Sequence, residues 1–208
     1  MKKYRNLLPL FVVQFFTWLG LFSLWIYATP VVTKYIFKTV NLENSAYENG
    51  IQWVGICFAL YSLLGASLTF FLHKILKIYN KYLVHAISLL MGSLGLISIY
   101  FVESKYILLL SFIFIGIGWS SISTIPYLIV GELAEEGKEE KYFSVFNFST
   151  VIPQAIAAFF LGYLTKNLFS GETSKTIFSG GIFMLIASII TFFIFLFEKK
   201  KALLVNNN

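Results

Sequence analysis

Six long stretches of this chain contain no Asp, Glu, Lys or Arg, and every charged residue lies between or outside them. Each stretch is 21 to 25 residues long. An α-helix needs about 20 apolar residues to cross the hydrocarbon core of a bilayer, because each residue adds about 1.5 Å of length. The six predicted spans are 7–29, 51–72, 82–102, 106–130, 142–164 and 177–197. This pattern predicts a polytopic membrane protein.

The composition indicates the same class, with 58% hydrophobic and 12% charged residues and a mean hydropathy of +0.78. The apolar runs are continuous rather than alternating, which favours helices over a β-barrel. The first stretch is too long for the apolar part of a signal peptide, and Pro30 follows it where small residues would mark a cleavage site. We therefore expect an all-α fold in which residues 1–208 form a single bundle of six transmembrane helices.

The basic residues predict the orientation of the bundle. If both termini face the cytoplasm, 11 of the 16 Lys and Arg residues lie on the cytoplasmic side. This excess follows the positive-inside rule, to which the five Glu of the loop 131–141 contribute little. The formal charge of +6 is then a topology signal and does not indicate a nucleic-acid partner. We expect a multi-pass protein of the cell (inner) membrane with both termini in the cytoplasm.

Uncharged polar and aromatic side chains within the spans are the candidate functional residues, since such groups in lipid prefer the bundle interior or a water-filled cavity. Helical neighbours recur at three, four, seven and eleven residues. At these spacings the sequence shows three stripes, which are Gln14, Trp18 and Trp25, then Trp119, Ser123 and Tyr127, and then Asn147, Thr150 and Gln154. The stripes mix amide or hydroxyl groups with flat aromatic surface. A sugar needs both, for its hydroxyls and for its C–H face.

Other roles also fit several of these residues. Gln14 and Asn147 have the chemistry of hydrogen bonds between helices, and Trp25 lies near a span end, where an aromatic belt residue is expected. At Trp53, also near a membrane edge, a belt role and a place at a cavity mouth fit equally well. Trp119 and Gln154 lie deeper, where a belt does not explain them. We predict eight substrate-binding residues, namely Gln14, Trp18, Trp53, Trp119, Ser123, Tyr127, Asn147 and Gln154.

Two prolines, Pro126 and Pro153, lie inside predicted spans. Proline removes one backbone hydrogen bond of a helix and clashes with the preceding turn, which produces a kink or local unwinding. We predict that both residues are helix hinges.

No catalytic pattern is present in the sequence. It contains no HExxH, no Gly-rich phosphate loop before a Lys and no GxSxG, and the spans contain no acidic residue. His73 lies in a loop and His85 near the start of a span, so the two do not form a ligand cluster. Cys57 is the only cysteine, which excludes an internal disulfide. We predict a protein that is not an enzyme and that needs no cofactor and no metal.

Spans four and five carry a more specific pattern. Residues 116–127 read GIGWSSISTIPY and residues 146–154 read FNFSTVIPQ. Together they resemble the sucrose/maltose-type sugar–cation symporters, which belong to the glycoside–pentoside–hexuronide branch of the major facilitator superfamily. Residues 14–27 and 46–55 resemble the same family, so the similarity runs over nearly the whole chain.

The resemblance implies the C-terminal half of such a transporter, because family members have twelve spans and these six are similar to the last six. It implies cation-coupled transport of a disaccharide or glycoside through a central cavity lined partly by spans one, two, four and five. The cavity residues implied by the resemblance are Gln14, Trp18, Trp119, Tyr127, Asn147 and Gln154. A missing or separate N-terminal six-helix half, or a second copy, would then be the partner within the lipid bilayer.

A second hypothesis is a truncated or degenerate membrane protein, or a scaffold, that transports nothing. It accounts equally well for the absent first half and for the lack of acidic residues in the spans.

Overall fold

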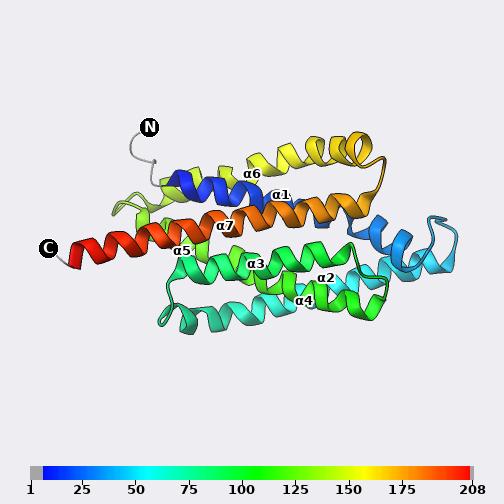
Figure 1. Cartoon of the computed structure of the whole chain (residues 1–208), viewed down its shortest axis with the longest axis horizontal. Helices are drawn as coiled ribbons and strands as arrows, with labels where there is room; N and C mark the ends of the chain where they lie inside the picture. The colour runs from blue at the N-terminus through cyan, green and yellow to red at the C-terminus, as the bar shows by residue number, and fades with distance from the viewer. Residues whose placement is uncertain (1–6, 207–208) are drawn as a thin grey trace.

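The computed structural model describes residues 7–206, and within this range the chain contains helices and loops but no β-strand. Six helical segments in this range are long and apolar enough to cross a membrane. They are Leu8–Ile36, Ser45–Leu76, Lys81–Ile99, Lys105–Leu133, Glu139–Leu168 and Thr173–Lys201. The predicted fold class, an all-α six-helix membrane bundle, is confirmed (Figure 1). Lys2, Lys3 and Arg5, on which part of the predicted orientation depends, lie outside the described residues.

The first and fifth segments each end in a short π-helical turn, and the fourth is divided into two helices. In chain order the elements are α1 (Leu8–Val31) with the turn Val32–Ile36, α2 (Ser45–Leu76), α3 (Lys81–Ile99), α4 (Lys105–Ile122), α5 (Ile125–Leu133), α6 (Glu139–Tyr163) with the turn Leu164–Leu168, and α7 (Thr173–Asn206). Two helices start at asparagine caps. The Asn44 side chain accepts a hydrogen bond from the amide of Ala46, and the Asn80 side chain accepts one from Tyr82.

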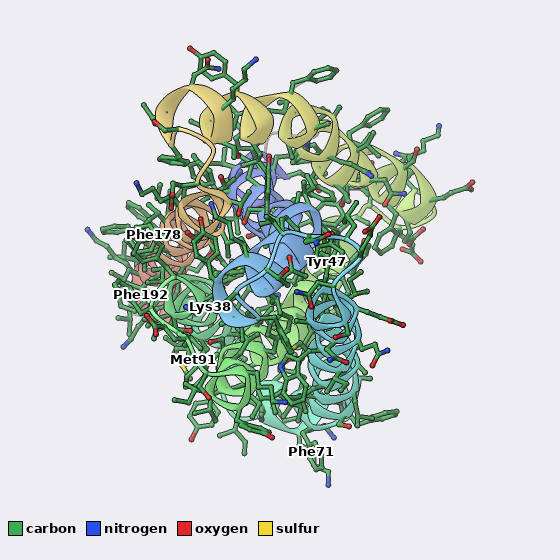
Figure 2. The ribbon with its side chains drawn as sticks, turned by 90° about the vertical axis from the view of Figure 1, so that its right-hand side faces the viewer. Lys38, Tyr47, Phe71, Met91, Phe178 and Phe192 are labelled. Atoms are coloured by element: carbon green, nitrogen blue, oxygen red, sulfur yellow. The ribbon has the colours of Figure 1, made fainter. Side chains whose placement is uncertain are left out.

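The helices run back and forth between two ends of the bundle (Figure 1). One end holds the start of α1, the α2–α3 and α5–α6 connections and the last turns of α7, and we call it the termini end. The opposite end holds the α1–α2, α3–α4 and α6–α7 connections, and we call it the loop end (Figure 1). Seen from the loop end, α6 lies at one margin of the bundle and α2 at the other, where Phe71 projects outward, with α1 between them (Figure 2). Helix α1 packs against α6 and α7, and α4 packs against α2 and α3.

Small residues allow the inner helices to approach closely, as is common in membrane bundles. A Cβ atom added to Gly20 of α1 would lie 2.8 Å from the carbonyl oxygen of Gly180 in α7, so the two backbones are in direct contact. Serine side chains fasten α3 to α7. Ser93 donates to the carbonyl of Gly181 at 2.9 Å, and Ser188 donates to the carbonyl of Ala86 at 2.7 Å. Each such interhelical hydrogen bond contributes about 0.6 kcal/mol.

The two prolines singled out in the sequence have different surroundings. Helix α4 ends at Ile122 and α5 begins at Ile125, with Pro126 in the first turn of α5, where its missing N–H costs nothing. Pro153 instead lies within the continuous helix α6. The fourth span is therefore two helices joined at residues 123–124, whereas the fifth remains helical through its proline.

Candidate functional site

The interior of the bundle contains a cluster of aromatic rings centred on Trp119 of α4. The Trp119 ring lies 6.2 Å from Trp18 and 5.9 Å from Trp25, both on α1, and 6.0 Å from Tyr61 on α2, measured between ring centroids. All three contacts are edge-to-face, an arrangement that aromatic pairs favour. Phe22 completes the group, because its ring packs on those of Trp18 and Trp25. We call these five residues the aromatic cluster.

The local sequence explains how the rings reach one another. Trp18, Phe22 and Trp25 are separated by four and three residues, so they share one face of α1. Gly65 of α2 makes room for the indole of Trp119, since a Cβ atom at Gly65 would lie 2.6 Å from the Trp119 Cδ1 atom. Gly116 lets α4 approach α2 in the same way, because a Cβ atom there would lie 3.0 Å from the Tyr61 carbonyl oxygen.

Two polar atoms beside this cluster have no hydrogen-bond partner among the described residues. They are the indole Nε1 of Trp18 and the amide Oε1 of Gln14, one turn away on the same helix. Both residues are buried, with 8% and 1% of their surface exposed. A buried polar group left unpaired costs about 1–3 kcal/mol. The α1 face therefore holds one donor and one acceptor whose hydrogen-bonding capacity this conformation does not use.

The predicted residues of α5 and α6 form a separate, exposed group. Asn147 and Gln154 lie on the exposed surface of α6. Tyr127 of α5 is 37% exposed, and its ring packs on Phe143 and Phe146 of α6. The structure therefore brings Trp18 and Trp119 together, with Gln14 one turn from Trp18 on the same helix, and leaves the amides of α6 outside that group.

Ser123 lies in the chain between Trp119 of the aromatic cluster and Tyr127 of the exposed group. It lies at the break between α4 and α5, and its hydroxyl donates to the Trp119 carbonyl at 2.9 Å. The hydroxyl also lies 3.2 Å from the Ser120 carbonyl. In this conformation the Ser123 hydroxyl caps the end of α4.

Trp53 lies apart from the other candidates, at the loop end of α2. Its indole Nε1 donates to the Lys105 carbonyl at 3.0 Å, and the Lys105 ammonium lies 5.0 Å from its ring centroid. The ring of Tyr106 packs edge-to-face on it at 5.6 Å. These contacts attach α2 to the first turn of α4, which is the geometry of an interfacial anchor.

Phe22, Trp25, Tyr61 and Gly65 belong to the site but are absent from the eight predicted substrate-binding residues. Trp25 lies in a predicted stripe, but its position near a span end favours a belt role in the sequence. A signal for two of them is present in the sequence, since Trp53, Tyr61 and Gly65 are spaced by multiples of four and share one face of α2. No group of three or more His, Cys, Asp or Glu side chains within residues 7–206 is placed to hold a metal ion.

Comparison with known proteins gives one result. The family model described as Major Facilitator Superfamily matches residues 1–158, about three quarters of the chain. The match includes the whole aromatic cluster and most of α6. No curated protein and no solved structure matches the chain.

Proposed function

The chain belongs to the major facilitator superfamily of membrane transporters, and from this premise we propose that it carries a sugar, specifically a disaccharide or a related glycoside. In this proposal it is the C-terminal half of a sucrose/maltose-type sugar–cation symporter. The transported sugar binds at mid-membrane between this bundle and a second six-helix unit, and both termini of the chain face the cytoplasm of the inner membrane. Family members are transporters rather than enzymes, so no catalytic role is assigned.

The aromatic cluster with its two unpaired polar atoms is the observation that supports a sugar. A pyranose ring presents C–H groups on its faces and hydroxyls around its edge. Indole rings such as those of Trp18 and Trp119 bind the faces, while the Trp18 N–H and the Gln14 carbonyl offer one donor and one acceptor to the hydroxyls. These residues are neutral, which suits a neutral substrate.

The exposed amides of α6 support the second half of the proposal. Polar side chains such as Asn147 and Gln154 are costly against lipid tails, and they are expected to face a bundle interior or a water-filled cavity. In this superfamily two six-helix halves are related about the membrane normal and enclose the substrate pathway between them. A separate N-terminal half, or a second copy of this chain, would cover α6 and place its amides opposite the substrate.

The break at Pro126 supports alternating access. Residues 123–124 follow Trp119 by one helical turn, so rotation of α5 about this break would change the surroundings of the cluster. In the proposal, Pro126 and Pro153 are the positions at which the substrate-facing helices bend.

Two conservative variants test the sugar site. Trp18→Phe and Gln14→Met each remove one unpaired polar atom and keep most of the apolar volume. If these atoms bind the sugar hydroxyls, each variant should lower the affinity for a labelled disaccharide about tenfold, which corresponds to 1.4 kcal/mol. Each should also keep or raise the thermal stability of the sugar-free protein, because an unsatisfied buried group is removed.

The measurement is uptake into proteoliposomes containing the chain together with the product of any six-span reading frame immediately upstream. Trp53→Phe is the matched control, since it changes a tryptophan outside the cluster and should leave uptake unchanged. Normal uptake by both test variants would remove Gln14 and Trp18 from the site. An absence of uptake in every combination of chains, with unrelated sequence upstream, would favour the non-transporting alternative.

A further inference from the structure

A cavity of about 330 Å³ lies at the termini end of the bundle, between α1, α3, α5 and α7. Its polar lining comes from Tyr82 and His85 of α3 and from Thr191, Glu198 and Lys201 of α7. Apolar side chains of α1 and α5, with Ile194 of α7, form the rest of the wall. The cavity is separate from the aromatic cluster, because the two share no residue.

His85 is the buried residue of this cavity whose hydrogen bonding is incomplete. Its side chain is 0% exposed, and among the described residues it is the only His, Asp, Glu, Lys or Arg that is buried. The ring Nδ1 lies 2.6 Å from the hydroxyl oxygen of Ser121 in α4. The other ring nitrogen, Nε2, is buried without a partner in the described part of the chain. Because Ser121 occupies Nδ1, Nε2 is the ring nitrogen of His85 that remains available to bind a proton.

The lining residues of α7 trace a path from this histidine to the surface. Thr191, Glu198 and Lys201 are spaced by seven and three residues and lie on one helical face. At 1.5 Å per residue, the ten residues from Thr191 to Lys201 cover about 15 Å along the helix. Glu198 and Lys201 are exposed, so the cavity has a charged mouth and a buried imidazole.

Among the titratable side chains that line the cavity, His85 is the fully buried one. On α3, Tyr82 lines the cavity, and Lys81 at the helix start forms an ion pair with Glu132 of α5. Helix α1 contributes Pro9, Leu10 and Val13 to the lining, none of which titrates. Helix α4 does not line the cavity and faces His85 through the Ser121 hydroxyl, which does not titrate either. The charged groups of α7 are Glu198 and Lys201 at the mouth.

We propose that His85 is a proton-binding site reached from the termini end through this cavity. In the tautomer with its proton on Nδ1, that N–H donates to the Ser121 hydroxyl oxygen, and the Nε2 lone pair accepts a proton from a water molecule in the cavity. The resulting imidazolium donates through both nitrogens, and release returns the proton from Nε2 to water.

The hydrogen bond to Ser121 couples the proton to the helix break. Ser121 lies next to Ile122, the last residue of α4, and its carbonyl accepts the amide of Thr124 within the break. A charged imidazole is poorly solvated in the enclosed conformation of this structure, so proton binding favours conformations in which the cavity is hydrated. This coupling rests on the proposed transport function, because the same break follows Trp119 of the sugar site. The proton site itself does not depend on it.

The first test detects the protonation of His85 directly and needs no substrate. The chain contains two histidines, so His73→Gln leaves His85 as the single imidazole. In ¹⁵N-histidine-labelled protein in lipid nanodiscs, we expect Nε2 to change from unprotonated to protonated as the pH is lowered. A neutral imidazole with an unchanged tautomer at every pH at which the protein stays folded by circular dichroism would overturn the proposal.

Matched serine variants test the contact to α4. Ser121→Ala removes the partner of Nδ1 and should shift the midpoint of the His85 titration. Ser120→Ala is the control, because the Ser120 hydroxyl donates to the Ile117 carbonyl and does not contact His85. Equal midpoints in the two variants would contradict the assigned hydrogen bond.

Uptake measurements test the coupling separately. In the reconstituted transporter, His85→Gln should abolish the dependence of sugar uptake on an imposed pH gradient while sugar exchange at equal pH continues. An unchanged gradient dependence would refute the coupling. If no sugar is transported by any combination of chains, the proposed function fails, and the nanodisc titration alone decides the proton site.

Discussion

Helices α1 and α6 carry similar polar stripes but lie in opposite surroundings. In the most apolar part of each span, 61% of the residues are buried for α1 and 28% for α6. Gln14 of α1 is enclosed beside the aromatic cluster, whereas Gln154 of α6 is exposed. A polar stripe in the sequence shows that a helix has a polar face. Whether that face is buried depends on which helices pack against it. The bundle thus has an enclosed centre around α1 and α4 and exposed margins at α2 and α6, and in our proposal a partner covers the margin at α6.

The largest expected effect is at the centre of the cluster. Trp119→Ala removes the ring that contacts Trp18, Trp25 and Tyr61, and it should lower the free energy of unfolding by about 3–5 kcal/mol. Phe159→Ala, at an 81% exposed position of α6, is the control and should change stability by less than about 1 kcal/mol. Thermal unfolding in detergent measures both. Similar losses for the two variants would show that centre and margin do not differ.

Two glycines test whether the centre of the bundle is packed more closely than the margin at α6. A Cβ atom at Gly180 of α7 would overlap the side chain of Ser23 in α1, whereas one at Gly162 of α6 would meet no atom within 4 Å. Gly180→Ala should therefore destabilise the bundle by about 1–3 kcal/mol, as overpacking does in closely packed cores. Gly162→Ala should be neutral or slightly stabilising, because alanine favours a helix more than glycine does. A stable Gly180→Ala protein would mean that α1 and α7 are less tightly packed than described.

The fold could be predicted from the sequence because one physical rule governs it. Charged side chains are excluded from hydrocarbon, so their absence from six stretches identifies the spans before any helix is seen. The ends of the helices are less predictable, since α2 starts at Ser45, six residues before the apolar stretch, where the Asn44 side chain caps it. That extension depends on local capping chemistry rather than on hydropathy.

The candidate site could be predicted only within single helices. The spacing of Trp18 on α1 identified a face, and the structure places that face against Trp119. The contribution of Tyr61 was missed because it depends on Gly65 leaving space for an indole from another helix. Pro126 and Pro153 have the same local chemistry, yet only the first lies at a break between helices. Sequence spacing alone carries no information on such packing between helices.

A smaller effect is expected at the margin of α2. Trp53→Phe removes the hydrogen bond to the Lys105 carbonyl and keeps an aromatic ring near the Lys105 ammonium. The loss of one such bond should cost about 0.5–1.5 kcal/mol. Thermal unfolding measures it, with Trp53→Ala as a comparison that also removes the ring. If Trp53→Phe instead lowered sugar affinity without affecting stability, Trp53 would belong to the sugar site and would not serve only to attach α2 to α4.

The smallest effect on stability, and the one that separates centre from margin most directly, is expected at Gln154. In the isolated chain its side chain is exposed, so Gln154→Ala should change the free energy of unfolding by less than about 0.5 kcal/mol. In a complete transporter the same side chain would face the substrate pathway, and the variant should then lower uptake several-fold at unchanged protein levels. Phe159→Ala, on the same helix, should leave uptake unaffected. A large stability loss in the isolated chain would indicate that α6 is covered without a partner, whereas normal uptake by Gln154→Ala would place this face of α6 against lipid.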